Sequence, residues 1–135
     1  MNESGMWKTL YLHMRGLWHA QRHEDIYSSG IPDVSYAIDG ICGWIELKYI
    51  KEWPKRPTTI IRVKHLTKQQ RLWLRQRGKR CDNVFLFLRV NYDWLLFRHT
   101  HVNMIGSLNK EDLFSIAEFH CGRIFDKEKF MKCIR

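Results

Sequence analysis

The sequence has no apolar run approaching the roughly 20 residues that a membrane-spanning helix needs, and its N-terminus lacks a signal-peptide pattern. Its four cysteines are far apart and form no Cys-x-x-Cys pair, which argues against a disulfide framework and against a zinc site. Acidic residues are few, with 14 Asp and Glu against 23 Lys and Arg. We therefore expect a soluble, cytoplasmic protein with reduced thiols and no membrane partner.

The basic excess gives a formal net charge of +9 over 135 residues. Such a charge favours a polyanionic partner, with nucleic acid as the first candidate and an anionic membrane surface as the alternative. The length suits one domain, and 44% hydrophobic residues indicate a folded chain with its own core. We therefore treat residues 1–135 as a single domain.

Residues 30–50 have the pattern of two short strands joined at Asp39-Gly40, a pair that favours a two-residue hairpin turn. In the register set by that turn, Asp33 lies directly across from Glu46. Facing carboxylates destabilise a sheet unless a positive charge lies between them, and a hard divalent cation is the usual solution. The hairpin therefore predicts a metal site.

Lys48 extends this cluster, because residues two apart on a strand project to the same face as each other. Glu46 and Lys48 then share one face, whereas Leu47 projects to the other. Asp33, Glu46 and Lys48 are expected to converge. The alternative is that Asp33 only caps a strand and that Glu46 and Lys48 lie on an exposed sheet face.

Pro32-Asp33 followed by Glu46-Leu47-Lys48 resembles the motif of the PD-(D/E)XK nuclease superfamily, in particular the small phage and virus-repair (VRR-NUC) nucleases with Holliday-junction-resolvase-like folds. The resemblance implies that Asp33, Glu46 and the backbone carbonyl of Leu47 bind Mg²⁺ or Mn²⁺. It also implies that Lys48 positions and activates the attacking water.

The expected order of elements agrees with this family's αβββαβ core over residues 4–98. We expect a helix over 4–14, a strand over 17–23, the hairpin, a helix over 67–77, a buried strand over 84–88 and a further strand over 94–98. The fold class is thus α/β and restriction-endonuclease-like, with a central mixed sheet flanked by helices. Residues 104–135 are expected to form a helical extension, including one helix over 107–119.

Two further residues are candidates for the site. Family members often place another acidic residue near the metal, and Glu24 is our choice over Glu3 because it is nearer in sequence to Asp33; a solvated surface acid is the alternative. Many relatives also carry a catalytic Gln on the helix that begins at Thr67; Gln69 and Gln70 are the candidates, and Gln70 is our choice. A capping box formed with Thr67 would by itself explain Gln70.

The segment 51–65 contains two prolines and is strongly basic, so we expect a loop that contacts the DNA backbone beside the site. Trp53 either stacks on a base or sugar there or is packed into the core. The expected DNA-binding residues are Lys51, Trp53, Lys55, Arg56, Arg62, Lys64, Lys68 and Arg71.

Together these residues predict a Mg²⁺-dependent or Mn²⁺-dependent DNA endonuclease that acts on branched DNA such as a Holliday junction. We expect a homodimer that places two sites on two strands, encoded by a phage and active in the cytoplasm of a bacterial host. The alternative is a non-catalytic protein of the same fold that binds DNA or a partner protein.

Overall fold

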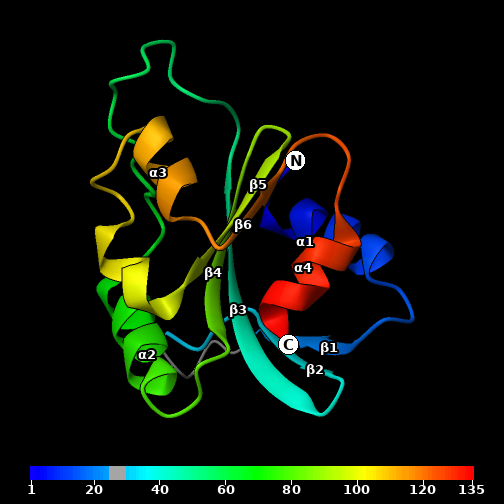
Figure 1. The fold of residues 1–135 in the computed structure, drawn as a ribbon. Helices are drawn as coiled ribbons and strands as arrows, with labels where there is room; N and C mark the ends of the chain where they lie inside the picture. Colours follow the sequence, from blue (N-terminus) through cyan, green and yellow to red (C-terminus); the bar gives the residue numbers. More distant parts are fainter. Residues whose placement is uncertain (25–29) are drawn as a thin grey trace.

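A computed structural model describes residues 1–24 and 30–135, and in it a six-stranded sheet lies between two layers of helices (Figure 1). The strands are β1 (His19–Arg22), β2 (Val34–Ile38), β3 (Ile41–Ile50), β4 (Val84–Val90), β5 (Asp93–Arg98) and β6 (Phe119–Cys121). The helices are α1 (Glu3–His13), α2 (Lys68–Gly78), α3 (Lys110–Ile116) and α4 (Lys127–Ile134), with a 3₁₀ helix at His99–Met104. The strands are adjacent in chain order, and only β3 and β4 pair in parallel. None of the described helices is both long and apolar enough to cross a membrane.

The hairpin of β2 and β3 forms as the sequence predicts. Asp39 and Gly40 have φ of 49° and 80°, which are the left-handed conformations that this tight turn requires. The ladder runs from the Ile38–Ile41 pair to the Val34–Ile45 pair, and Asp33 directly precedes it. The register that brings Asp33 beside Glu46 is thus confirmed.

The elements on either side of the hairpin are also close to prediction. Asn2 caps α1 by accepting a hydrogen bond from the Gly5 amide, and the helix ends at His13. Thr67 and Gln70 form the predicted capping box at the start of α2. The crossover through α2 leads to the buried, parallel strand β4, as the apolar run at 84–88 predicts.

The C-terminal region differs from the expected helical extension. Asn109 caps α3, but the helix ends at Ile116, and β6 then pairs with β5 and completes the sheet. Leu113 packs in the apolar layer beneath α2 and α3, whereas Phe119 packs in the layer beneath α1 and α4. The chain must cross from one face of the sheet to the other within these few residues, and an extended strand does this where a continued helix would not.

Gly78 supports a stability prediction, because a Cβ at this position would overlap the ring of His99. His99 is buried, and its Nε2 lies 2.9 Å from Asp82 Oδ1. In an open helix Gly→Ala stabilises by about 1 kcal/mol, whereas overpacking a core costs about 1–3 kcal/mol. We expect Gly78→Ala to lower the free energy of unfolding by about 1 kcal/mol in urea denaturation, the net of these two effects.

The matched control is Gly122→Ala, whose added Cβ would meet nothing nearer than 3.7 Å. This variant should unfold within about 0.5 kcal/mol of wild type, as substitutions away from tight packing do. Equal stability of the two variants would show that His99 moves aside without cost.

Candidate active site

Strand β3 carries the central residues of the site. Glu46 and Lys48 share one face, and Leu47 on the opposite face is packed in the apolar layer beneath α1 and α4. Asp33 reaches this strand from the start of β2, where its Oδ2 accepts a hydrogen bond of 2.8 Å from the Leu47 amide. Because the N–H and C=O of one strand residue point to the same side, the Leu47 carbonyl also faces Asp33.

Glu46 and Lys48 form a buried ion pair, with 3.1 Å between Glu46 Oε2 and Lys48 Nζ. Their side chains are only 2% and 6% exposed. The Lys48 ammonium also donates to the backbone carbonyl of His65 at 2.8 Å, which holds it in place. Lys48 is therefore a fixed positive charge beside the two carboxylates.

Glu46 is strongly perturbed by this environment. Burial, and then the neighbouring Asp33 carboxylate, raise the pKa of Glu46 to about 8, although the Lys48 ammonium acts in the opposite direction. Glu46 Oε1 is buried and has no hydrogen-bond partner among the residues that the structure describes. A buried carboxylate oxygen without a partner is costly and indicates that a further positive group belongs there.

These groups open onto a pocket of about 310 Å³. It lies between the N-terminus of α1 and the start of α2, beyond the point where the ladder of β2 and β3 ends. Its walls are formed by Asn2, Glu3, Ser4, Arg22, Asp33, Glu46, Leu47, Lys48 and Gln70. Since the Leu47 side chain is fully buried, its backbone is what reaches the pocket.

The donor set fits a hard divalent cation. Asp33 and Glu46 offer carboxylate oxygens, and Leu47 offers a backbone carbonyl; Mg²⁺ and Mn²⁺ prefer such oxygen ligands. Within residues 1–24 and 30–135, no three His, Cys, Asp or Glu side chains are grouped to hold a metal. A metal here would be held by two side chains and a backbone group, with water in its other positions.

The two candidates for an additional acid differ in placement. Glu3 lines the pocket from the first turn of α1, whereas Glu24 is exposed and is not part of the pocket wall. The structure thus favours Glu3 over our choice of Glu24. Sequence distance to Asp33 was a poor guide, because α1 returns to the site through its packing on β3.

We expect Glu3→Gln to weaken Mn²⁺ binding about fivefold, since a carboxylate acting through water contributes roughly 1 kcal/mol. Glu24→Gln carries the same charge change and should leave the affinity unchanged. Isothermal titration calorimetry on both variants measures this directly. A loss confined to Glu24→Gln would reverse the assignment.

Gln70 serves the capping box and also reaches the pocket. Its Oε1 accepts a hydrogen bond of 3.0 Å from the Thr67 amide, and the residue forms part of the pocket wall. With the oxygen engaged, the side-chain amide nitrogen is the group available to donate toward the site. Both roles considered for Gln70 are therefore compatible.

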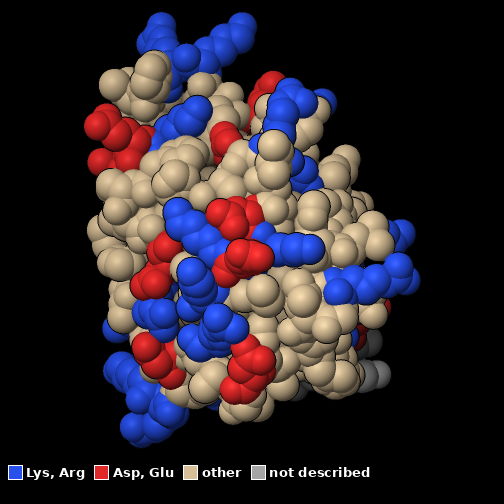
Figure 2. All heavy atoms as spheres, turned by 45° about the vertical axis from the view of Figure 1, so that its right-hand side comes forward, with Lys and Arg blue, Asp and Glu red and all other residues tan. Residues whose placement is uncertain are grey.

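The basic residues expected to bind DNA fall into two groups. Arg62 and Lys64 are exposed and line a second pocket of about 220 Å³, which shares Glu3 and Lys48 with the first. The others on exposed positions are Lys51, Lys55, Arg56 and Lys68. Figure 2 shows Lys and Arg side chains at the tip of the long loop, and mixed charges over the face that carries α1 and α4.

Trp53 and Arg71 instead make contacts inside the protein. The Trp53 indole donates to Asp93 at 2.7 Å, and its ring packs on Phe114. The Arg71 guanidinium donates to the Val102 carbonyl at 2.6 Å, which ties α2 to the 3₁₀ helix. These contacts favour the core interpretation of Trp53, and they engage part of the Arg71 guanidinium within the protein.

Arg22 is a site residue that the sequence did not suggest. It lies on β1 opposite Val34, the residue that follows Asp33 in the chain. Its guanidinium donates to the Ser4 hydroxyl at 3.1 Å. The pairing of β1 with β2 is the signal that would have found it, and the sequence gives no register for that pair.

No protein-family model matches this sequence, and no curated protein is similar to it. A solved structure is similar, that of Hjc from Archaeoglobus fulgidus, a Holliday junction resolvase from an archaeal hyperthermophile. The TM-score is 0.51 at 17% sequence identity, over 72% of this chain and 77% of the resolvase. The two proteins share a fold. This confirms the restriction-endonuclease-like α/β fold that the motif and the element order predict, and at this identity the likeness concerns the fold alone.

Proposed function

We propose that this protein is a metal-dependent DNA endonuclease that hydrolyses phosphodiester bonds in branched DNA. One observation carries the proposal: Asp33, Glu46 and Lys48 converge on one pocket, where the buried Glu46 Oε1 has no partner among the described residues. The fold shared with a Holliday junction resolvase supports it, because that protein acts on branched DNA.

Asp33, Glu46 and the Leu47 carbonyl are the groups that would hold Mg²⁺ or Mn²⁺ in this pocket. When bound, such an ion lowers the pKa of a coordinated water and polarises the scissile phosphate. The Lys48 ammonium, fixed by His65 and Glu46, has a remaining N–H for the attacking water or a phosphate oxygen. The Gln70 amide and Arg22 offer further donors to the phosphate.

Substrate binding would rest on the exposed basic residues around the site. Arg62 and Lys64 flank it directly, and Lys51, Lys55, Arg56 and Lys68 extend the positive surface. The N-terminus of α1 also faces the pocket, where the helix dipole favours a phosphate group. Contacts of this kind carry no sequence information, so affinity should fall steeply with salt.

We infer selectivity for DNA structure because the described residues contain no element suited to reading base sequence. No helix or hairpin in the described residues has the arrangement of a base-reading module. A homodimer would place two such sites on two strands of a junction. Because the motif resembles that of small phage nucleases, we infer that a phage encodes the protein and that it acts in the cytoplasm of a bacterial host.

The test is cleavage of labelled four-way junction, flap, single-stranded and linear duplex DNA with Mg²⁺, Mn²⁺ or EDTA. Glu46→Gln, purified in parallel, controls for contaminating nucleases. Symmetric metal-dependent nicks in the junction are the expected result. Retained DNA binding without cleavage of any substrate would contradict the catalytic proposal and leave a DNA-binding protein of the same fold; loss of both would favour a partner-binding protein.

A further inference from the structure

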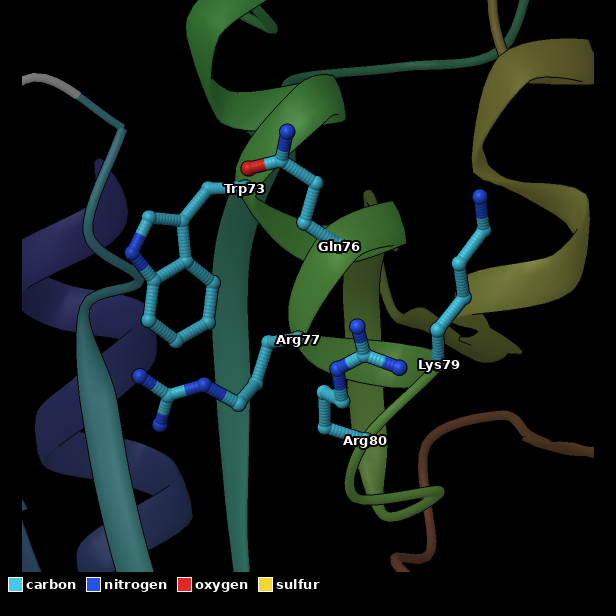
Figure 3. Close-up of a pocket in the computed structure, with 5 residues that line it drawn as sticks. All are labelled: Trp73, Gln76, Arg77, Lys79 and Arg80. Atoms are coloured by element: carbon cyan, nitrogen blue, oxygen red, sulfur yellow. The ribbon is translucent and has the colours of Figure 1, made fainter.

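A third pocket, which we call the α2 pocket, is basic and lies toward the C-terminal end of α2 (Figure 3). It shares no residue with the active-site pocket. Its volume is about 450 Å³, and it is lined by Trp73, Gln76, Arg77, Lys79 and Arg80. Trp73 is half-buried, whereas the other four residues are exposed.

Trp73 gives the pocket an aromatic surface, and Trp44 packs edge-on against this ring at an interplanar angle of 67°. The Trp73 and Trp44 ring centroids are 5.1 Å apart, and the Arg77 guanidinium carbon lies 4.6 Å from the Trp73 centroid. Figure 3 shows Trp73 and Arg77 projecting from the same side of α2, with the guanidinium beside the indole. Flat indole and guanidinium groups of this kind are the surfaces on which nucleic acid bases stack.

The pocket is also positively charged without compensation. Among residues 1–24 and 30–135, no carboxylate lies within ion-pair distance of Arg77, Lys79 or Arg80. The nearest acid along the chain, Asp82, is engaged by Arg98 and His99. Stacking surfaces beside uncompensated cations suit a nucleotide, with its base on the rings and its phosphate on the cations.

Two structural elements connect this pocket with the active site. Trp44 and Glu46 are two residues apart on the same face of β3, which separates them by roughly 7 Å along the strand. On α2, Gln70 lies at the active site while Trp73 and Arg77 follow at positions i+3 and i+7, on one side of the helix. A DNA strand that leaves the active site along α2 therefore reaches the α2 pocket within a few nucleotides.

We propose that this pocket binds an unstacked nucleotide of the DNA strand whose phosphate occupies the active site. The base stacks on Trp73 and Arg77, and Lys79 and Arg80 hold the adjoining phosphates. A base inside an intact duplex cannot stack on a protein ring, so the pocket selects single-stranded or branch-point DNA. The inference rests on the proposed nuclease function and supplies a physical source for its selectivity.

The first test measures binding without metal, in EDTA, to a single-stranded oligonucleotide and to a duplex of the same length. Lys79→Ala/Arg80→Ala should weaken single-strand binding about tenfold and reduce the slope of log K against log salt by about 1.4, because two phosphate contacts are lost. Duplex binding should change by less than about twofold. Lys129→Ala/Lys132→Ala removes the same charge from exposed positions of α4 and should leave both affinities near wild type.

The second test follows stacking directly with a 2-aminopurine base in the single strand. Wild type and Trp73→Phe should quench its fluorescence on binding, whereas Trp73→Leu, which keeps apolar volume without a ring, should not. Thermal unfolding of both variants shows whether either has lost its fold. If Trp73→Leu proves unstable, Arg77→Gln, which removes the exposed guanidinium but keeps the ring, should retain the quenching and weaken binding of the single strand more than binding of the duplex.

These measurements separate the two proposals, because binding in EDTA does not depend on cleavage. Glu46→Gln should retain the single-strand preference while losing cleavage. Equal losses for single strand and duplex in Lys79→Ala/Arg80→Ala, or losses matched by the α4 control, would overturn the pocket assignment and leave the nuclease proposal intact.

Discussion

Replacing Glu46 with glutamine is expected to reduce metal-dependent cleavage of junction DNA by more than about 100-fold, since losing even a group that only supports a metal ligand costs 10–100-fold. Glutamine keeps the shape of the side chain but removes its charge, and Glu46 Oε1 is the buried oxygen without a partner in the described residues. Single-turnover cleavage with Mg²⁺ and with Mn²⁺ measures the effect. DNA binding in EDTA should be retained, which distinguishes a catalytic loss from unfolding.

Lys48 provides the complementary variant. Lys48→Met removes the ammonium but keeps the apolar stem, so the packing around this buried side chain is largely preserved. We expect slower cleavage at saturating Mn²⁺, because Lys48 is not itself a metal ligand and offers its remaining N–H to the substrate. Lys132→Met, at an exposed position of α4 outside the proposed DNA-binding surface, is the control and should cleave normally. Wild-type cleavage by either Glu46→Gln or Lys48→Met would contradict the proposed roles.

The parts of the fold that the sequence predicts correctly are those that depend on nearby residues. The turn at Asp39-Gly40 needs only two residues with positive φ, and it fixes which side chains of β2 and β3 face each other. The capping box at Thr67 and Gln70 is equally local. Because the hairpin brings Asp33 beside the strand of Glu46 and Lys48, the core of the candidate site also follows from the sequence.

The parts that the sequence does not predict depend on distant partners. Trp53 is fixed by Asp93, which is 40 positions away at the start of β5. Phe119 leaves the helical pattern because its packing partners, among them Phe87 and Phe130, lie on the other face of the sheet. Glu3 reaches the pocket only because α1 packs against β3. No local pattern encodes any of these three contacts.

The stability of the metal-free protein is expected to fall as pH rises from about 5 to about 8, through the titration of Glu46. Burial and the neighbouring Asp33 raise the pKa of Glu46 to about 8 in the folded protein. In the unfolded chain, where neither acts, its ordinary pKa is 4.5. Between these values the folded state holds a proton that the unfolded state has released, so raising the pH favours unfolding. The contribution is complete below the unfolded pKa and is lost by about pH 8, with a total on the order of 5 kcal/mol.

Urea denaturation in EDTA between pH 5 and pH 9 measures this loss for wild type and Glu46→Gln. Burial lowers the pKa of His13, which acts in the opposite direction within the same range, so the difference between the two proteins isolates Glu46. Glu46→Gln, which has no carboxyl to titrate, should lack this pH-dependent decline. Mn²⁺ should restore wild-type stability most strongly at high pH, where a divalent cation no longer competes with the proton on Glu46. Parallel pH profiles for the two proteins would show that Glu46 is already ionised at neutral pH and that Lys48 alone compensates it.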